Sequence, residues 1–243
     1  MRQTRLGRRK HGLRGRLDAI VKRALDVSMA GALLVLALPI CVILAIAIKV
    51  DSPGPVFYRC RRVGLAGREF AMWKFRKMWD GARGPALTTA VDERLTRLGR
   101  FLAASKLDEL PQLWNVVKGD MSLVGPRPED PLFVNREPES YREILRVRPG
   151  ITGLSQLAFA RETEILDAAD RVGHYLAAIF PQKLALDTVY VSRRSVRMDL
   201  MILIWTARAT LARREVAVNR ANGKLTLRDR RVLRQVVEQS EAA

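Results

Sequence analysis

The chain is organised around the stretch Ser105-Lys-Leu-Asp-Glu-Leu-Pro-Gln-Leu-Trp-Asn-Val-Val-Lys-Gly-Asp-Met-Ser-Leu-Val-Gly-Pro-Arg-Pro128. Asp108 and Glu109 come just before Pro111, which an α-helix accepts only in its first turn. Apolar residues then recur at helical spacing, and Gly119 follows as the expected C-cap. The sequence therefore predicts a short helix that begins beside a pair of carboxylates.

The same stretch ends on an arginine held between two prolines, Pro126-Arg127-Pro128. Prolines fix their own φ and restrict the residue before them, so they pre-orient a guanidinium fork that suits two phosphate oxygens. The simpler alternative is an arginine paired with a structural carboxylate in a turn. Lys74 and Arg76, with Lys77, add further cations at the end of a strand, which could instead be a solvated strand edge.

Asp108 has two interpretations. It can cap the helix with its side chain, with Glu109 as a first-turn charge. It can also be a phosphoryl acceptor, because a helix N-terminus is a natural phosphate site and an ionised Asp can attack phosphorus. In that case Glu109 is a base or helps to hold a divalent cation, and oxygen ligands favour Mg²⁺.

The composition of the 243-residue chain indicates a polyanionic partner, since the net charge is +18. Aromatic residues make up only 6%, and no basic run is interleaved with aromatics, which argues against single-stranded nucleic acid. Cys41 and Cys60 have no metal or redox spacing, and His11 and His174 lie far from the motif. These spacings therefore argue against a zinc site and a Ser-His triad.

The N-terminal part predicts a membrane segment. Residues 1–23 hold nine Lys or Arg and one acid, and residues 27–48 carry no charge. As a helix this uncharged run is about 33 Å long, close to the thickness of a bilayer core. Pro39 and the positive charges on both flanks fit a helix that breaks and returns through the same face. A kinked transmembrane helix remains the alternative.

The rest of the chain predicts a helix-rich domain with a small hairpin. Strands are expected at 56–58 and 69–75, and helices at 92–102, 141–145 and 162–190. Residues 198–211 have a strong apolar face and fit a helix in the membrane interface, or else a core helix. The segment from Glu215 onward is polar and is expected to be peripheral.

The residues quoted first closely resemble the signature of the bacterial sugar transferases, the monotopic phosphoglycosyl transferases. The resemblance covers about residues 18–212 and is carried by further short motifs: Lys22-Arg-Ala-Leu-Asp26, Ser52-Pro-Gly-Pro-Val-Phe57, Lys74-Phe-Arg76, Arg148-Pro-Gly-Ile-Thr-Gly153 and Leu186-Asp187 with Tyr190. The chain is similar to the small, single-domain form of this family.

The resemblance implies a reaction that moves a sugar-1-phosphate from a UDP-sugar to undecaprenyl phosphate and releases UMP, in a ping-pong mechanism. It makes Asp108 the nucleophile, Glu109 its partner, and both of them the Mg²⁺ site. It implies a re-entrant membrane helix. Together with the cations noted above, it gives these expected substrate-binding residues: Lys74, Arg76, Lys106, Pro126, Arg127, Pro128, Arg148, Gln156 and Asp187.

The chain departs from the family pattern in a few places. Ala103-Ala104 replaces a basic pair before the dyad, so another cation such as Lys106 has to substitute. Leu38-Pro39 replaces a Ser-Pro break, and Ser155-Gln156 a Trp-Gln pair. A Gly-Arg pair is only loosely matched near Arg161.

We therefore expect an α+β, helix-rich fold in four parts: a basic segment (1–16), a re-entrant membrane helix broken at Pro39 (17–50), a cytoplasmic catalytic domain with interfacial amphipathic helices (51–214) and a tail (215–243). The expected partners are a UDP-sugar, undecaprenyl phosphate and lipids of the bacterial inner membrane, without nucleic acid. A homodimer is compatible with the sequence. The competing functions are a catalytically weak membrane scaffold for glycan assembly and a membrane-tethered nucleic-acid-binding protein.

Overall fold

The computed structural model describes residues 3–84, 87–88, 92–160, 170–212, 216–219 and 221–227, with backbone alone for 3–16, 171, 211–212 and 227. The expected features at Arg161 and at 228–243 lie outside these ranges. The helices are α1 (Gln3–Asp51), α2 (Arg97–Ser105), α3 (Gln112–Lys118), α4 (Pro131–Val134), α5 (Pro138–Ile144), α6 (Leu154–Ala158), α8 (Arg171–His174), α9 (Phe180–Arg193) and α10 (Val196–Ala212). The strands are β1 (Phe57–Val63), β2 (Glu69–Phe75), β3 (Ser122–Val124), β4 (Gly150–Thr152), β5 (Val216–Val218) and β6 (Leu225–Leu227).

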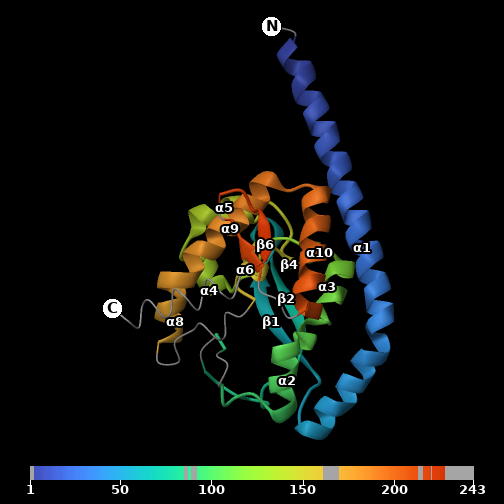
Figure 1. The fold of residues 1–243 in the computed structure, drawn as a ribbon, viewed down its shortest axis with the longest axis vertical. Coiled ribbons are helices and arrows are strands. Elements are labelled where there is room, and N and C mark those ends of the chain that lie inside the picture. The colour runs from blue at the N-terminus through green and yellow to red at the C-terminus, as the bar shows by residue number, and fades with distance from the viewer. Residues whose placement is uncertain are drawn as a thin grey trace.

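Helix α1 runs along one side of the domain, and its N-terminal part extends beyond the body of the molecule (Figure 1). Pro39 lies inside this helix, and the helix bends toward its C-terminal end. The expected break is therefore a bend rather than an interruption. A proline removes one backbone hydrogen bond and crowds one carbonyl, which bends a helix when the neighbouring turns remain bonded.

Residues 17–51 of α1 form a helix long and apolar enough to cross a membrane. Its middle is uncovered by the rest of the protein: Val35 is 70% exposed, Leu36 75% and Ile43 65%. An exposed apolar surface of this extent marks a site of contact with lipid or with another protein.

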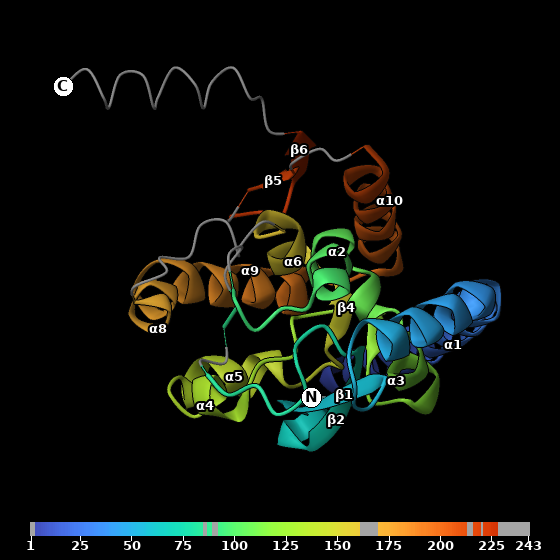
Figure 2. The same ribbon diagram turned by 90° about the horizontal axis from the view of Figure 1, so that it is seen from below.

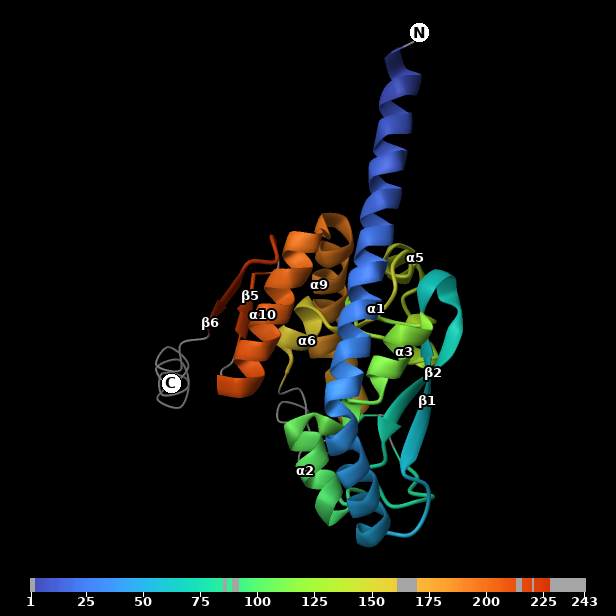
Figure 3. The same ribbon diagram turned by 90° about the vertical axis from the view of Figure 1, so that its right-hand side faces the viewer.

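The N-terminal end of this apolar helix is joined to the domain by polar contacts. Arg23 donates to the carbonyl of Val116 at 2.8 Å, at the C-terminal end of α3. The Asp26 carboxylate accepts the hydroxyl of Ser122 at 2.7 Å and the N–H of Leu123 at 3.1 Å, both on β3. Figure 3 shows α1 from this side, with α10 on one flank and α3 and the β1–β2 hairpin on the other.

The β1–β2 hairpin confirms the two strands expected there, although β1 is longer than predicted. The strands pair antiparallel, with Phe57 opposite Phe75 and Val63 opposite Glu69. Buried side chains from the hairpin join the core beneath α3, including Cys60 and Met72. Near the end of β2, Lys74 donates to the side chain of Glu109 at 3.1 Å, shortly before α3 begins.

A parallel pair, β3 and β4, lies at the centre of the domain, with Ser122 opposite Gly150 and Val124 opposite Thr152. Gly125, just after β3, lies close to Gly150 of β4, and a Cβ on either one would overlap the backbone of the other segment. This close approach fixes the path of the loop that follows β3.

Seen from below, α4, α5 and α8 lie on the opposite side of the domain from α1 (Figure 2). The helix expected at 162–190 is present where it is described, as α8, a π-helical turn (Tyr175–Ile179) and α9. Helix α10 buries Met198 and Ile202 in the main core and exposes Leu200 and Ile204. The buried face confirms the core-helix interpretation, and the membrane-interface interpretation of the exposed face stays a prediction.

The short hairpin β5–β6 packs into the main core through Val216, which is 4% exposed, and Leu225, which is 6% exposed. The expectation that the chain from Glu215 onward is peripheral is wrong for this hairpin. A few buried apolar side chains in a polar segment do not give a clear periodic signal, because each strand is only three residues long.

Candidate active site

Asp108 and Glu109 lie in a single 3₁₀ turn, Leu107–Glu109, between α2 and α3. Lys106 joins this turn to α2 with φ of 60°, a left-handed conformation that is strained for a residue with a side chain. The N-cap of α3 is Pro111, and the side chain of Asp108 caps no helix. The N-cap interpretation of Asp108 is therefore wrong, whereas the predicted C-cap at Gly119 is confirmed, with φ of 102°.

The carboxylate of Asp108 is buried, and the described residues give it no ordinary hydrogen bond. The residue is 1% exposed, and no described residue gives either of its oxygens a well-directed hydrogen bond. Its nearest cation is Lys77, whose Nζ lies 3.1 Å from Oδ2. Burying a charged group without full compensation costs free energy, so such a group in a folded protein calls for an explanation.

Glu109 is held in its charged form. Burial by itself would raise the pKa of this carboxyl, but the charges of Lys74, Arg127 and Lys106 outweigh burial and lower the pKa to about 2. The Nζ of Lys74 donates to Oε1 at 3.1 Å. A carboxylate with so low a pKa is a poor proton acceptor at neutral pH, which favours a ligand or electrostatic role over that of a base.

The cations around the dyad come from three separate elements. Lys74 and Lys77 lie at and just after the end of β2, Lys106 is on the exposed rim between α2 and the 3₁₀ turn, and Arg127 is in the loop after β3. These residues surround the dyad with positive charge, as transfer of a phosphoryl group requires.

Arg127 is positioned by the ends of β3 and β4. Gly125 donates to Thr152 and Gly150 donates to Pro126, at 2.9 and 2.8 Å, so the two strands fix the start of the loop. Pro126 and Pro128 are both buried. Between them, the side chain of Arg127 remains 36% exposed, close enough to lower the pKa of Glu109.

Asp187 and Gln156 hold this loop and the adjacent strand β4 by hydrogen bonds to the backbone. The carboxylate of Asp187 accepts the hydroxyl of Ser155 at 2.7 Å and the backbone N–H of Arg127. Burial raises the pKa of Asp187 to about 7, with a contribution from the nearby charge of Glu129, and the two hydrogen bonds partly offset the increase. Gln156 donates to the carbonyl of Gly150 at 3.2 Å.

Two of the expected substrate-binding residues have structural partners elsewhere. Arg76 donates to the carbonyls of Ser52 and Pro53 at 2.8 and 2.6 Å, in the turn that ends α1. Arg148 donates to the carbonyl of Gly119 at 2.8 Å, at the C-terminal end of α3. The structure brings neither guanidinium to the dyad, and their contacts are those of caps on helix ends and turns.

Comparison with known proteins decides the family. A model for the bacterial sugar transferases matches residues 17–213. The chain belongs to the bacterial sugar transferase family. It is 40% identical over 196 residues to a UDP-glucose:undecaprenyl-phosphate glucose-1-phosphate transferase of Caulobacter vibrioides, covering 78% of this chain and 69% of the relative.

Two further relatives differ in how much of their own length matches this sugar transferase. An exopolysaccharide production protein, PSS, of Rhizobium leguminosarum bv. phaseoli is 37% identical over 208 residues, which are 81% of this chain and 98% of that protein. A UDP-N-acetylgalactosamine-undecaprenyl-phosphate N-acetylgalactosaminephosphotransferase of Aeromonas hydrophila is 35% identical over 198 residues. That match covers 79% of this chain but only 44% of the relative.

The dyad of this sugar transferase fits a magnesium ion that is completed by substrate. No group of three or more His, Cys, Asp or Glu among the described residues could hold a metal. Mg²⁺ is commonly held by one or two carboxylates together with the phosphates of a substrate. Asp108, whose oxygens lack hydrogen bonds, and the ionised Glu109 provide such a pair.

Another cation lies beside the dyad of the transferase, where Ala103-Ala104 provides no basic pair. Lys77, a cation noted at the end of the predicted strand but not among the expected substrate-binding residues, makes the closest cation contact to Asp108. The signal for it was present, because Lys77 directly follows the Lys74-Phe-Arg76 motif at the end of a predicted strand. Glu129, Tyr175 and Lys183, which lie behind Arg127, carried no such signal.

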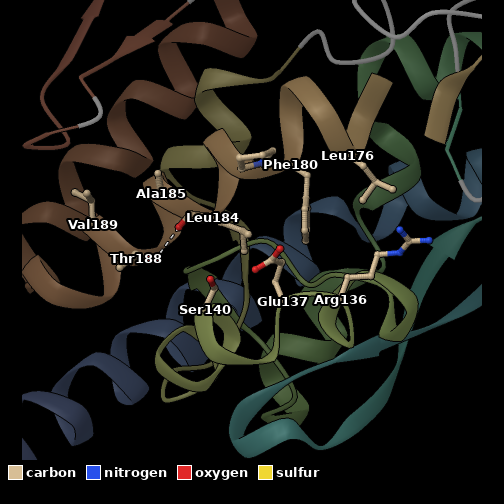
Figure 4. Close-up of a pocket in the computed structure, with 10 residues that line it drawn as sticks. Arg136, Glu137, Ser140, Leu176, Phe180, Leu184, Ala185, Thr188 and Val189 are labelled. Atoms are coloured by element: carbon tan, nitrogen blue, oxygen red, sulfur yellow. Dashed lines mark hydrogen bonds between the residues drawn. The ribbon is translucent and has the colours of Figure 1, made fainter. Parts of the chain in front are cut away.

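A groove of about 800 Å³ opens on another part of the transferase, between α5 and α9 (Figure 4). Glu137, Ser140 and Thr188 are among its lining residues, and the dyad is not. The candidate active site is therefore defined by its cations and buried carboxylate and not by this groove.

Proposed function

We propose that this protein transfers a sugar-1-phosphate from a UDP-sugar to undecaprenyl phosphate, in two steps, with a covalent intermediate on Asp108. The observation that carries the proposal is the buried carboxylate of Asp108, which has no hydrogen bond among the described residues and faces Lys77 at 3.1 Å. The printed names of its relatives, which act on UDP-glucose or UDP-N-acetylgalactosamine and undecaprenyl phosphate, support the substrate classes.

In the first step an oxygen of Asp108 attacks the phosphorus that bears the sugar. The bond between that phosphorus and the oxygen bridging to the uridine phosphate breaks, and UMP leaves with the bonding electrons. In the second step a phosphate oxygen of undecaprenyl phosphate attacks the same phosphorus, which releases the carboxylate of Asp108 and forms undecaprenyl-diphosphate-sugar. Each step exchanges one phosphorus–oxygen bond for another.

The other residues of the site stabilise charge, bind phosphate and would hold the metal ion. Lys74 keeps Glu109 charged, Lys77 lies 3.1 Å from Asp108, and Arg127 binds phosphate oxygens with a fork that both prolines orient. Asp108 and Glu109 would hold Mg²⁺, which when bound supplies positive charge to the diphosphate. The low pKa of Glu109, about 2, keeps it ionised for this role.

We further propose that α1 enters the inner membrane from the cytoplasmic face and returns to it. Both ends of the apolar segment contact the same domain, through Asp26 at one end and through Asp51 at the other, where its Oδ1 accepts the N–H of Leu98 at 3.4 Å. A straight helix of this length would place those ends about 38 Å apart, on opposite sides of a bilayer. A single domain outside the bilayer cannot bind both ends of a helix that crosses it.

The proposed reaction is tested by measuring UMP release from purified protein in detergent or nanodiscs, with undecaprenyl phosphate, Mg²⁺ and a panel of UDP-sugars. We expect sustained release with at least one member of the panel, and its loss when EDTA removes the metal. Protein that binds UDP-sugars but releases UMP with none of them would instead support the scaffold alternative.

The membrane proposal is tested with single cysteines placed at Asp18 and Arg59, in a variant with Cys41 and Cys60 replaced by Ala. Both positions are exposed and flank the apolar segment. We expect a membrane-impermeant maleimide to label both sites in inside-out vesicles and neither in intact spheroplasts. Labelling of either one in spheroplasts would mean that α1 spans the membrane.

A further inference from the structure

Behind Arg127 lies a buried polar cluster that the proposed reaction does not use. Glu129 is 8% exposed, Tyr175 1% and Lys183 3%. The hydroxyl of Tyr175 donates to Oε1 of Glu129 at 3.0 Å, and the Nζ of Lys183 donates to the same hydroxyl at 3.4 Å. Lys183 also lies 4.7 Å from the centre of the Tyr175 ring. Burying charged groups this deeply is costly, so their arrangement calls for a purpose beyond packing.

The cluster ends on the guanidinium of Arg127. The same Oε1 of Glu129 that accepts from Tyr175 lies 3.9 Å from Nε of Arg127. This distance is that of an ion pair rather than a hydrogen bond. A charge fixed beside Nε restrains the plane of the guanidinium and hence the direction of its two terminal nitrogens. Without it, a partly exposed arginine would have to lose the rotamer freedom of a long side chain when it binds.

The position of Glu129 is itself determined on both sides. Its backbone carbonyl accepts the N–H of Val63 at 3.1 Å, which ties it to the end of β1. Its carboxylate is fixed by Tyr175, the first residue of the π-helical turn Tyr175–Ile179. Turns of this kind are rare and occur frequently at functional sites.

Helix α9, which carries Lys183 of this cluster, also binds the backbone of Arg127. Asp187, one turn beyond Lys183 on α9, accepts the N–H of Arg127. The π-helical turn and α9 therefore restrain one residue at two places. Asp187 of α9 binds the main chain of Arg127, and Tyr175 of the turn acts on its side chain through Glu129. A purely structural cluster would have no reason to converge on the residue that faces the dyad.

We propose that Glu129, Tyr175 and Lys183 are positioning residues that set the guanidinium of Arg127 for the diphosphate of the nucleotide-sugar. This inference rests on the proposed function, in which Arg127 binds that diphosphate. It assigns Glu129 no contact with substrate, and its effect passes entirely through Arg127.

The test is a double-mutant cycle between the cluster and Arg127. Glu129→Gln keeps the shape of the side chain and removes its charge, and Tyr175→Phe removes only the hydroxyl. We expect each to raise the KM for the UDP-sugar and the Kd for UDP about tenfold, with a smaller change in kcat. Arg127→Ala is expected to lower kcat/KM about a hundredfold.

In the Arg127→Ala background, Glu129→Gln and Tyr175→Phe should have no further effect on kcat/KM or on the Kd for UDP. If their effects instead multiply with that of Arg127→Ala, or if both single variants match the wild type, the inference is wrong. The Kd for UDP can be measured without turnover. If the wild type releases no UMP, the proposed reaction is wrong. The double-mutant cycle on the Kd for UDP would still test whether these residues position Arg127.

Tyr190→Phe is the matched control. Tyr190 is a second buried tyrosine, whose hydroxyl lies 2.7 Å from Oδ1 of Asp199 and 3.0 Å from the carbonyl of Val124, and none of its described contacts is with Glu129 or Arg127. Tyr190→Phe also removes a buried hydroxyl, so it should lower Tm about as much as Tyr175→Phe does. It should leave the KM for the UDP-sugar unchanged. Equal increases in KM for the two variants would show that general destabilisation, and not positioning, is the cause.

Discussion

Replacing Asp108 by Asn is expected to lower the rate of UMP release from a UDP-sugar about a thousandfold or more. The amide has nearly the same shape as the carboxylate, but it is a far weaker nucleophile and carries no charge for Lys77 or Mg²⁺. Because the carboxylate lacks hydrogen bonds from the described residues, the substitution breaks none of the described ones. The rate is read from UMP formed in the presence of Mg²⁺ and undecaprenyl phosphate.

Asp120→Asn provides the comparison for that variant. Asp120 lies just past the end of α3 and pairs with Lys118 at 3.2 Å, away from the dyad. We expect this variant to release UMP at close to the wild-type rate. Wild-type turnover in Asp108→Asn would remove Asp108 as the nucleophile, whatever the effect of Asp120→Asn.

Replacing Asp26 by Ala is expected to lower the free energy of unfolding by about 1–3 kcal/mol, because it leaves a buried backbone donor without its acceptor. Asp26 is 6% exposed, and its loss leaves the N–H of Leu123 without its acceptor, whereas the hydroxyl of Ser122 retains the carbonyl of Val124 at 2.8 Å. It also removes a charge 3.6 Å from Lys22. Denaturant unfolding in detergent micelles, followed by tryptophan fluorescence, measures the change.

Asp18→Ala removes an exposed carboxylate from the same helix and serves as the control for Asp26→Ala. An exposed substitution of this kind should change stability by no more than about 0.5 kcal/mol. If the two variants unfold at the same denaturant concentration, the contact between α1 and β3 does not stabilise the domain as described.

The sequence predicts those parts of the site that depend on local pattern. The hairpin follows from alternation and turn residues, and the C-cap at Gly119 from the end of a helical pattern. The dyad and Arg127 stand out because their neighbours are prolines and because the stretch resembles a known family. Family membership is confirmed, and each of these features lies within a few residues of the signal that predicts it.

What the sequence could not show depends on burial and on contacts between distant residues. The capping role suggested for Asp108 fails because a 3₁₀ turn and Pro111 come between it and α3. Arg76 and Arg148 look like phosphate ligands in the motif, yet each binds backbone carbonyls. Glu129 meets a tyrosine 46 residues further along the chain, a pairing that no local pattern contains.

The cations bear on the choice between an enzyme and an inactive scaffold. The absence of a basic pair at Ala103-Ala104 motivated the scaffold alternative. Lys77 stands 3.1 Å from Asp108, and Lys74 3.1 Å from Glu109, so the dyad retains its positive surroundings without that pair. This arrangement favours the enzyme.

The most direct test of the central claim is the mass of the protein after incubation with Mg²⁺ and an accepted UDP-sugar in the absence of undecaprenyl phosphate. The account predicts one added sugar-phosphate per chain, on the peptide that contains Asp108, and its loss when undecaprenyl phosphate is then supplied. Turnover of that UDP-sugar by the complete system, with no sugar-phosphate on Asp108 at any time after mixing, would contradict the account.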